Sequence, residues 1–264
     1  MALGLCLIFG VMKTVNFAHG EFLMLGAYAT YYLFGQIGMP YILSFILTMA
    51  LLFALGFGIE KGFLRPIRGN TVAGFIFTLG LSMFLMNLGW LVFGLVTKGV
   101  PSPFPGLLQV GTVRTSVERV VTAVIALGLI GGLMYIVYRS KLGRAFRAVA
   151  QDPEAAQLQG VNISHISSLS LAISLALAGA SGSLVACLFN ILPSMGVRPC
   201  ALAFVIVVVG GLGSIPGAII AALLVGLVES FVSIYVGTIW SWGAIFLMAF
   251  LVIAFRPQGL RGRA

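Results

Sequence analysis

Residues 41–59 read YILSFILTMALLFALGFGI, a run without a single charged side chain. The hydrocarbon core of a bilayer is about 30 Å thick, and about 20 apolar helical residues cross it. Comparable apolar runs occupy 72–96, 120–138, 166–188 and 240–255. We therefore predict an all-α integral membrane protein, a polytopic helical bundle of about seven to eight transmembrane helices.

The composition supports the same class. Of the 264 residues, 60% are hydrophobic and 8% are charged, whereas roughly 25% of an ordinary soluble domain is charged. The longest polar connections, 97–119 and 139–165, are too short to build an independent core. We therefore predict one domain over 1–264. The net charge of +9 does not indicate nucleic-acid binding, because the positive residues lie at the ends of apolar runs.

The distribution of positive charge predicts the topology, because cytoplasmic loops carry an excess of Lys and Arg. Three groups follow apolar runs and are assigned to the cytoplasm: Lys61, Arg65 and Arg68; Arg139, Lys141, Arg144 and Arg147; Arg256, Arg261 and Arg263. The other connections carry fewer basic residues and are placed outside. The expected location is a bacterial-type inner membrane, with the chain crossing several times and its C-terminus in the cytoplasm.

Three regions are less regular. Residues 22–37 form a short apolar run behind a polar stretch, 201–212 are too short to cross alone, and 214–233 begin again behind a proline. Broken passes are tolerated in membranes only where protein or a water-filled cavity lines them. This pattern predicts discontinuous half-helices beside a transport pathway.

The polar stretch before the first of these regions, VNFAHGEFLMLGAY (15–28), holds four pathway candidates: Asn16, His19, Gly20 and Glu21. A charge at the centre of a membrane helix costs about 2.5–3.5 kcal/mol on insertion scales, so Glu21 is expected to face protein or water. Two interpretations stay open. Either these side chains line the substrate path, or Asn16 caps a helix, Glu21 pairs with Lys13 and His19 bonds to a backbone carbonyl.

A second set of pathway candidates lies in GGLGSIPG (210–217): Gly210, Gly211, Gly213 and Pro216. Glycines in membrane helices allow close helix packing, or they mark a hinge with unwound backbone. Four glycines within eight residues exceed what packing requires, so we favour a functional break. Glu229, an ionisable residue inside an apolar run, is a further candidate.

The stretch GRAFRAVAQDPEAAQLQGVN (143–162) predicts two short helices joined by a tight turn. Asp152 can cap the second helix, with Pro153 at its first position and Glu154 near the positive end of its dipole, while Gly160 ends it. A rigid, alanine-lined element of this kind suits insertion into a groove on another protein. An ordinary juxtamembrane loop is the alternative.

These strings, together with FRPQG (255–259), resemble the permease family of ABC importers for branched-chain amino acids, and most closely the first of its two homologous permease subunits. The resemblance covers about 3–262. It implies a translocation pathway shared with a second, homologous permease, as a heterodimer. It also implies two ATP-binding cassette subunits docked on the coupling loop, about 139–165, and an extracytoplasmic substrate-binding protein.

The residues assigned by the resemblance to docking on the ATP-binding subunit lie in the coupling loop: Gly143, Arg144, Ala145, Arg147, Ala148, Asp152, Glu154, Ala155 and Gly160. Glu229 is expected either to pair with a basic side chain of the second permease or to form part of an outer gate. Family members usually start some twenty residues earlier, so the first helix, 1–12, is expected to be truncated.

The chain is expected to lack catalytic activity. It has no GxxxxGK[ST] string for ATP and no combination of nucleophile, base and oxyanion donors. We therefore expect no cofactor on this chain, with ATP used by the partner subunits. Its three cysteines lack metal-site spacing. Two other functions remain possible: a related permease for urea or short-chain amides, and an autonomous secondary transporter or channel.

Overall fold

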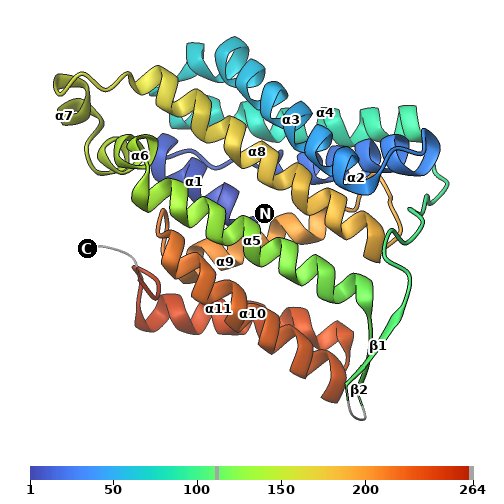
Figure 1. Cartoon of the computed structure of the whole chain (residues 1–264). Coiled ribbons are helices and arrows are strands. Elements are labelled where there is room, and N and C mark those ends of the chain that lie inside the picture. Colours follow the sequence, from blue (N-terminus) through green and yellow to red (C-terminus); the bar gives the residue numbers. More distant parts are fainter. Residues whose placement is uncertain (111–112, 262–264) are drawn as a thin grey trace.

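The computed structural model describes residues 1–110 and 113–261. Figure 1 shows long helices lying side by side in an elongated bundle. In chain order the helices and strands are α1 (Ala2–Met12), α2 (His19–Thr30), α3 (Tyr41–Ile59), α4 (Thr71–Phe93), β1 (Leu107–Val110), β2 (Val113–Ser116), α5 (Val117–Arg139), α6 (Lys141–Gln151), α7 (Pro153–Leu158), α8 (Ile163–Leu188), α9 (Val197–Gly210), α10 (Ile215–Tyr235) and α11 (Thr238–Phe255).

The predicted class is confirmed. Within the described residues, six helices are long and apolar enough to cross a membrane, and α1 and α9 are shorter apolar helices. Together these eight agree with the seven to eight expected. The α3 helix continues through a π-helical and a 3₁₀ turn, so the candidate membrane-spanning segment extends from Tyr41 to Ile67. The antiparallel hairpin of β1 and β2, which the sequence did not predict, projects at one end (Figure 1).

Helix α8 forms the centre of the bundle, with α1, α2 and α3 packed around it. Its 26 residues extend about 39 Å at 1.5 Å per residue. Small residues allow this packing, because a β carbon on Gly182 would lie 2.8 Å from the backbone nitrogen of Ala27, and one on Gly56 would lie 2.9 Å from the Cα of Ala172. Close backbone approach through small residues is the usual means of helix association in membranes.

The outer helices expose apolar side chains. On α4 and α11, Leu91 and Phe255 are each 83% exposed, and similar residues continue along α3, α5 and α10. Lipid, or the apolar face of another membrane subunit, is the environment that satisfies such a surface. The chain is therefore a multi-pass membrane protein.

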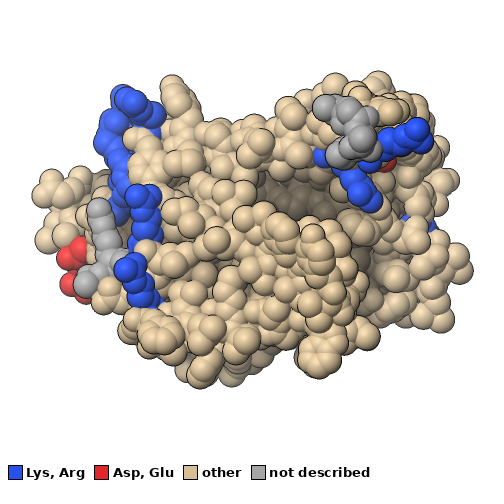
Figure 2. All heavy atoms as spheres, turned by 90° about the horizontal axis from the view of Figure 1, so that it is seen from below, with Lys and Arg blue, Asp and Glu red and all other residues tan. Residues whose placement is uncertain are grey.

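The described residues of the three basic groups lie at one end of the bundle, and Arg263 of the third group lies outside the described residues. Arg68 donates a hydrogen bond to Ser164 Oγ at 2.8 Å, which joins the first group to the start of α8. Arg147 of the second group and Arg261 of the third line one cavity. Figure 2 shows Lys and Arg gathered toward the two ends of the molecule, with an uncharged surface between them. On this face, the surface of the apolar middle is thus uncharged.

A buried ion pair fixes this basic end. Glu60 is fully buried and accepts hydrogen bonds from Arg68 and from the Ser168 hydroxyl of α8. A buried carboxylate costs free energy unless it is paired and hydrogen-bonded, and here both of its oxygens have partners. The contact fastens the connection between α3 and α4 to the central helix.

The expectation that 214–233 forms a broken pass was wrong. Helix α10 is continuous over 21 residues and long enough to cross. Pro216 lies in its first turn, where the backbone nitrogen needs no partner within the helix. The interruption lies before the helix, between Gly210 and Ile215.

Candidate pathway and coupling site

Two short helices begin inside the bundle and meet there. Helix α2 begins at His19 and α9 begins at Val197, and the glycines beside these starts touch. A β carbon on Gly20 would lie 2.5 Å from the carbonyl oxygen of Gly196. His19 is fully buried, and its Nε2 lies 3.3 Å from the carbonyl oxygen of Met1. The broken passes predicted at 22–37 and 201–212 are therefore confirmed, with the first helix starting three residues earlier.

The structural interpretation of the polar stretch holds for one of its three contacts. Asn16 Oδ1 accepts a hydrogen bond from the backbone nitrogen of Ala18 at 3.1 Å, but this bond lies in the turn before α2, whose N-cap residue is Ala18 and has no side-chain cap, so the expected cap by Asn16 was wrong. His19 contacts a backbone carbonyl, as expected. The pairing of Glu21 with Lys13 was wrong, because Glu21, in the first turn of α2, contacts α4 instead. There it accepts a hydrogen bond from Ser82 Oγ of α4 at 3.3 Å.

Two polar atoms at this helix start have hydrogen-bonding capacity left. Within the described part of the chain, His19 Nδ1 and Glu21 Oε2 are buried and have no hydrogen-bond partner. Most buried polar groups in proteins are paired. The first turn of α2 therefore places a buried imidazole and a buried carboxyl, each with one unpartnered polar atom, within one turn.

The glycine-rich segment is both an unwound turn and a close contact. Gly211 and Gly213 adopt φ values of 99° and 79°, which side chains rarely allow. A β carbon on Gly210 would lie 2.6 Å from the backbone nitrogen of Ala218, so α9 and α10 touch here. On the opposite side, a β carbon on Gly10 of α1 would lie 3.5 Å from the Cα of Gly213.

The closing segment of the chain completes this turn. The backbone nitrogens of Leu260 and Arg261 donate to the carbonyl oxygens of Val209 and Gly210, at 2.8 and 3.2 Å. The last carbonyls of a helix have no partner within it, so these bonds satisfy the end of α9. The contact explains why a glycine stands at position 259, where a β carbon would lie 2.5 Å from the backbone nitrogen of Gly211.

The predicted pair of short helices is present as α6 and α7. Asp152 Oδ1 accepts hydrogen bonds from the backbone nitrogens of Glu154 and Ala155 at 2.9 and 3.1 Å, which caps α7. Pro153 is its first residue, and Gly160 follows its end with a φ of 81°. Figure 1 shows α7 as the most projecting element at this end of the bundle.

Helix α6 is fastened to the end of α5. A β carbon on Gly143 would lie 2.5 Å from the carbonyl carbon of Val137, so only glycine fits. The guanidinium of Arg147 donates to the carbonyl oxygen of Val137 and lies 5.4 Å from the centre of the Tyr138 ring. Helix α6 and the last turn of α5 are therefore in direct contact through both backbone and side chains.

The other coupling candidates divide by exposure. Ala145 and Ala148 are half-buried against the core, whereas the remaining candidates are exposed: Arg144, Asp152, Glu154, Ala155 and Gly160. Leu158 of α7 is 88% exposed and was not among the candidates. The exposed rim of α6 and α7 is thus charged and apolar, and Ala145 and Ala148 of α6 face inward.

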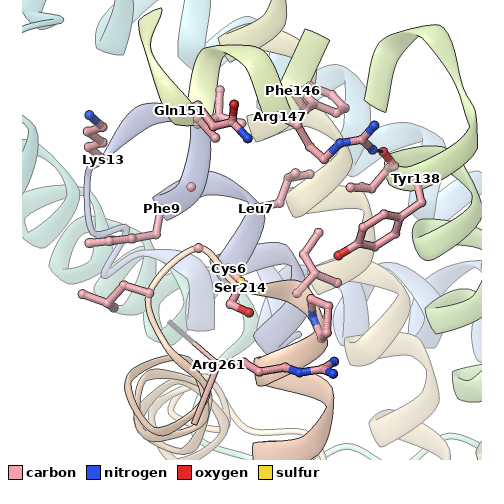
Figure 3. A pocket seen from close by; sticks show the side chains of 18 residues that line it. Cys6, Leu7, Phe9, Lys13, Tyr138, Phe146, Arg147, Gln151, Ser214 and Arg261 are labelled. Atoms are coloured by element: carbon pink, nitrogen blue, oxygen red, sulfur yellow. Dashed lines mark hydrogen bonds between the residues drawn. The ribbon is translucent and has the colours of Figure 1, made fainter. Parts of the chain in front are cut away.

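A cavity of about 680 Å³ lies between α6, the last turn of α5, the second half of α1 and the glycine-rich turn (Figure 3). The loop candidate Arg147 and the turn candidates Gly213 and Pro216 line the same space. Beside it, one hydrophobic cluster joins Phe146 of α6, Val11 of α1 and Ile215 of α10. The two sets of candidates predicted separately from the sequence therefore meet.

Glu229 has a partner that the sequence analysis missed. Its Oε1 lies 2.6 Å from Nη2 of Arg198, and the Arg198 guanidinium lies 5.2 Å from the centre of a Trp242 ring. The signal was the spacing: Arg198 precedes Ser214 by sixteen residues and Glu229 follows it by fifteen. A helical hairpin folded at Ser214 brings them together.

A bundle of membrane-length helices with two half-helices meeting inside it, and a two-helix loop at its basic end, defines a polytopic membrane permease. Comparison with known proteins specifies the family. The sequence model described as "Branched-chain amino acid transport system / permease component" matches residues 1–255, and the chain belongs to this family.

Named relatives extend the comparison. The chain is 33% identical over 278 residues to the high-affinity branched-chain amino acid transport system permease protein BraD of Pseudomonas aeruginosa, covering 100% of this chain and 91% of the relative. It is 31% identical over 279 residues to LivH of Escherichia coli K12, covering 100% and 90%. A probable LivH of Methanocaldococcus jannaschii is 28% identical over 285 residues, covering 99% and 87%. No solved structure matches the chain.

Proposed function

We propose that this chain is a transmembrane permease subunit of an ATP-driven ABC importer for branched-chain amino acids. The family match over residues 1–255 and the names of the relatives support this substrate class. The alternative, import of urea or short-chain amides, has no such support. ATP hydrolysis belongs to partner subunits, and this chain contributes the pathway.

The observation that carries the proposal is the meeting of α2 and α9 at Gly20 and Gly196 inside the bundle. Transporters place substrate sites where discontinuous helices end within the membrane, because the free N–H groups and positive dipole ends there attract anionic groups. An amino acid carries a carboxylate. His19 and Glu21 in the first turn of α2 are positioned to contact a passing polar group or water.

Coupling runs through α6 and α7. Two ATP-binding cassette subunits dock on this importer, one of them on the exposed rim of this chain, which includes Arg144, Glu154 and Leu158. When the two ATP-binding subunits close on ATP, they push on α6. The contacts of Arg147 and Gly143 pass that movement to α5. The shared hydrophobic cluster carries it to α1 and α10, on either side of the glycine-rich turn.

The remaining partners follow from the two ends of the bundle. The end with α6, α7 and the C-terminal segment is cytoplasmic, in line with its basic residues. The opposite end, with the hairpin of β1 and β2, faces the extracytoplasmic substrate-binding protein. A second, homologous permease completes the pathway as a heterodimer, covering apolar side chains that the outer helices expose.

Uptake of labelled leucine by cells with and without this gene tests the proposal. The expected result is uptake that is lost on deletion, blocked by unlabelled isoleucine and valine but not by urea, and abolished by ATP depletion. Competition by urea alone would favour the amide permease. Gene-dependent flux that survives ATP depletion would indicate an autonomous transporter.

A further inference from the structure

The cavity beside α6 is positively charged. Eighteen described residues line it, and they include Lys13, Arg147 and Arg261 but no aspartate or glutamate. Three cations around one space of about 680 Å³ repel one another unless an anion lies among them. The polar groups Tyr138, Gln151 and Ser214 also line it and can supply hydrogen bonds.

The cations approach from different walls. Figure 3 shows Arg147 and Tyr138 together on one wall and Arg261 below Ser214 on another, while Lys13 lies at the opposite rim. Arg147 is held in place by its hydrogen bond to Val137 and its contact with the Tyr138 ring. Arg261 is held through its backbone bond to Gly210. The guanidinium of Arg147 and the backbone of Arg261 are thus held on the scaffold before any ligand arrives.

The position of the cavity along the helices matches the level of lipid headgroups. Its walls come from the second half of α1, the last turn of α5, helix α6 and the first turn of α10. Where membrane helices end, the hydrocarbon core gives way to the headgroup layer. Leu7, Phe9 and Ile215 add apolar surface to the same cavity, which suits a ligand that joins a charged group to a hydrocarbon part.

We propose that this cavity binds the phosphate group of an anionic phospholipid. Guanidinium groups bind phosphate with two parallel hydrogen bonds, and basic pockets between helices on the cytoplasmic side of a membrane bind anionic headgroups. Free inorganic phosphate shares this charge but has no hydrocarbon part to place against the apolar wall. A bound headgroup bridges α6 to the segment that carries Arg261, so it stabilises the position of the coupling helix. The binding itself does not depend on which solute is transported.

The test uses the full chain, purified with the subunits that co-purify with it and reconstituted in nanodiscs of phosphatidylcholine with a minor fraction of phosphatidylglycerol. Lipid retained after transfer to detergent is counted by native mass spectrometry. The cavity variant carries Lys13→Gln and Arg261→Gln. The matched control carries Lys61→Gln and Arg65→Gln, which removes the same charge from exposed positions at the same end, outside the cavity.

The cavity variant is expected to retain about fivefold less phosphatidylglycerol for each charge removed, and the control is expected to match the unaltered chain. Equal retention by both variants would overturn the proposal. So would displacement of the lipid by millimolar inorganic phosphate, which would show a site for the free anion.

A second measurement uses the unaltered chain, so it tests the proposal even if the cavity variant fails to fold. In the unaltered chain, a photo-reactive phosphatidylglycerol is expected to label α1, α6 and the last turn of α5, and the label should be competed by unlabelled phosphatidylglycerol but not by phosphatidylcholine. Labelling confined to other helices would contradict the assignment.

Discussion

Gly20 and Gly196 touch through their backbones at the point where α2 and α9 begin. A β carbon on Gly20 would lie 2.5 Å from the carbonyl oxygen of Gly196 and 2.9 Å from Cβ of Cys200. Because a backbone oxygen cannot rotate away as a side chain can, nothing larger than glycine fits without moving one of the helices. This contact holds the two half-helices at the proposed pathway.

Gly20→Ala is therefore expected to destabilise the chain by about 1–3 kcal/mol, the usual cost of overpacking, and to reduce leucine uptake. Gly226→Ala on α10 is the matched control, because a β carbon there meets no atom within 4 Å. Thermal unfolding in detergent and uptake by cells measure the two effects. If the two alanine variants behaved alike, the close contact would not matter to the fold.

The buried pair of Glu60 and Arg68 gives a prediction about the basic end. Arg68→Met leaves the Glu60 carboxylate buried beside Ser168 without its cation, which typically costs about 3 kcal/mol or more. The loss is expected as a lower midpoint of thermal unfolding. Lys61→Met, which removes an exposed charge one residue from Glu60, should change the midpoint little. An unchanged midpoint for Arg68→Met would show that the pair does not hold α3 against α8.

Charge reversal on the exposed rim tests coupling. Arg144→Glu and Glu154→Arg should leave membrane insertion and folding intact, since both side chains are exposed, while ATP hydrolysis by the complex no longer drives uptake. Simultaneous assays of ATPase activity and leucine uptake on the purified complex measure the ratio. Reversal of the exposed Arg65 provides a control at the same end. Normal coupled uptake in the rim variants would place docking elsewhere.

The pair of Arg198 and Glu229 can be tested by exchange of its charges. Glu229→Arg sets two cations side by side and should lower uptake. Its effect on stability should stay within about 1 kcal/mol, because the two side chains are 49% and 30% exposed. The double variant Arg198→Glu with Glu229→Arg restores an ion pair and should recover uptake. No recovery in the double variant would mean that each side chain has a role of its own.

Local sequence signals predicted local structure well. The long spans followed from apolar length alone, and the turn between α6 and α7 followed from Asp152 and Pro153, because an N-cap and a first-turn proline act over three or four residues. The half-helix α9 was recognised because the apolar run 201–212 is too short to cross a bilayer.

Contacts between distant segments were not predictable in the same way. The partners of Glu21 and Glu229, namely Ser82 and Arg198, depend on how helices cross and on where the chain reverses. The continuity of α10 was missed because Pro216 was interpreted as a break, although a proline in the first turn starts a helix as readily as it ends one. The inward orientation of Ala145 and Ala148 depends on packing against α1 and α8, which the loop sequence does not contain.

The most direct test of the central claim is leucine uptake by proteoliposomes. The purified chain is reconstituted with its co-purifying subunits, the binding protein and labelled leucine are added outside, and either ATP or a non-hydrolysable analogue is enclosed inside. The account predicts accumulation of leucine against its gradient with ATP, none with the analogue, and inhibition by isoleucine and valine. Equal leucine entry in both preparations, or ATP-driven entry that isoleucine and valine leave untouched, would contradict it.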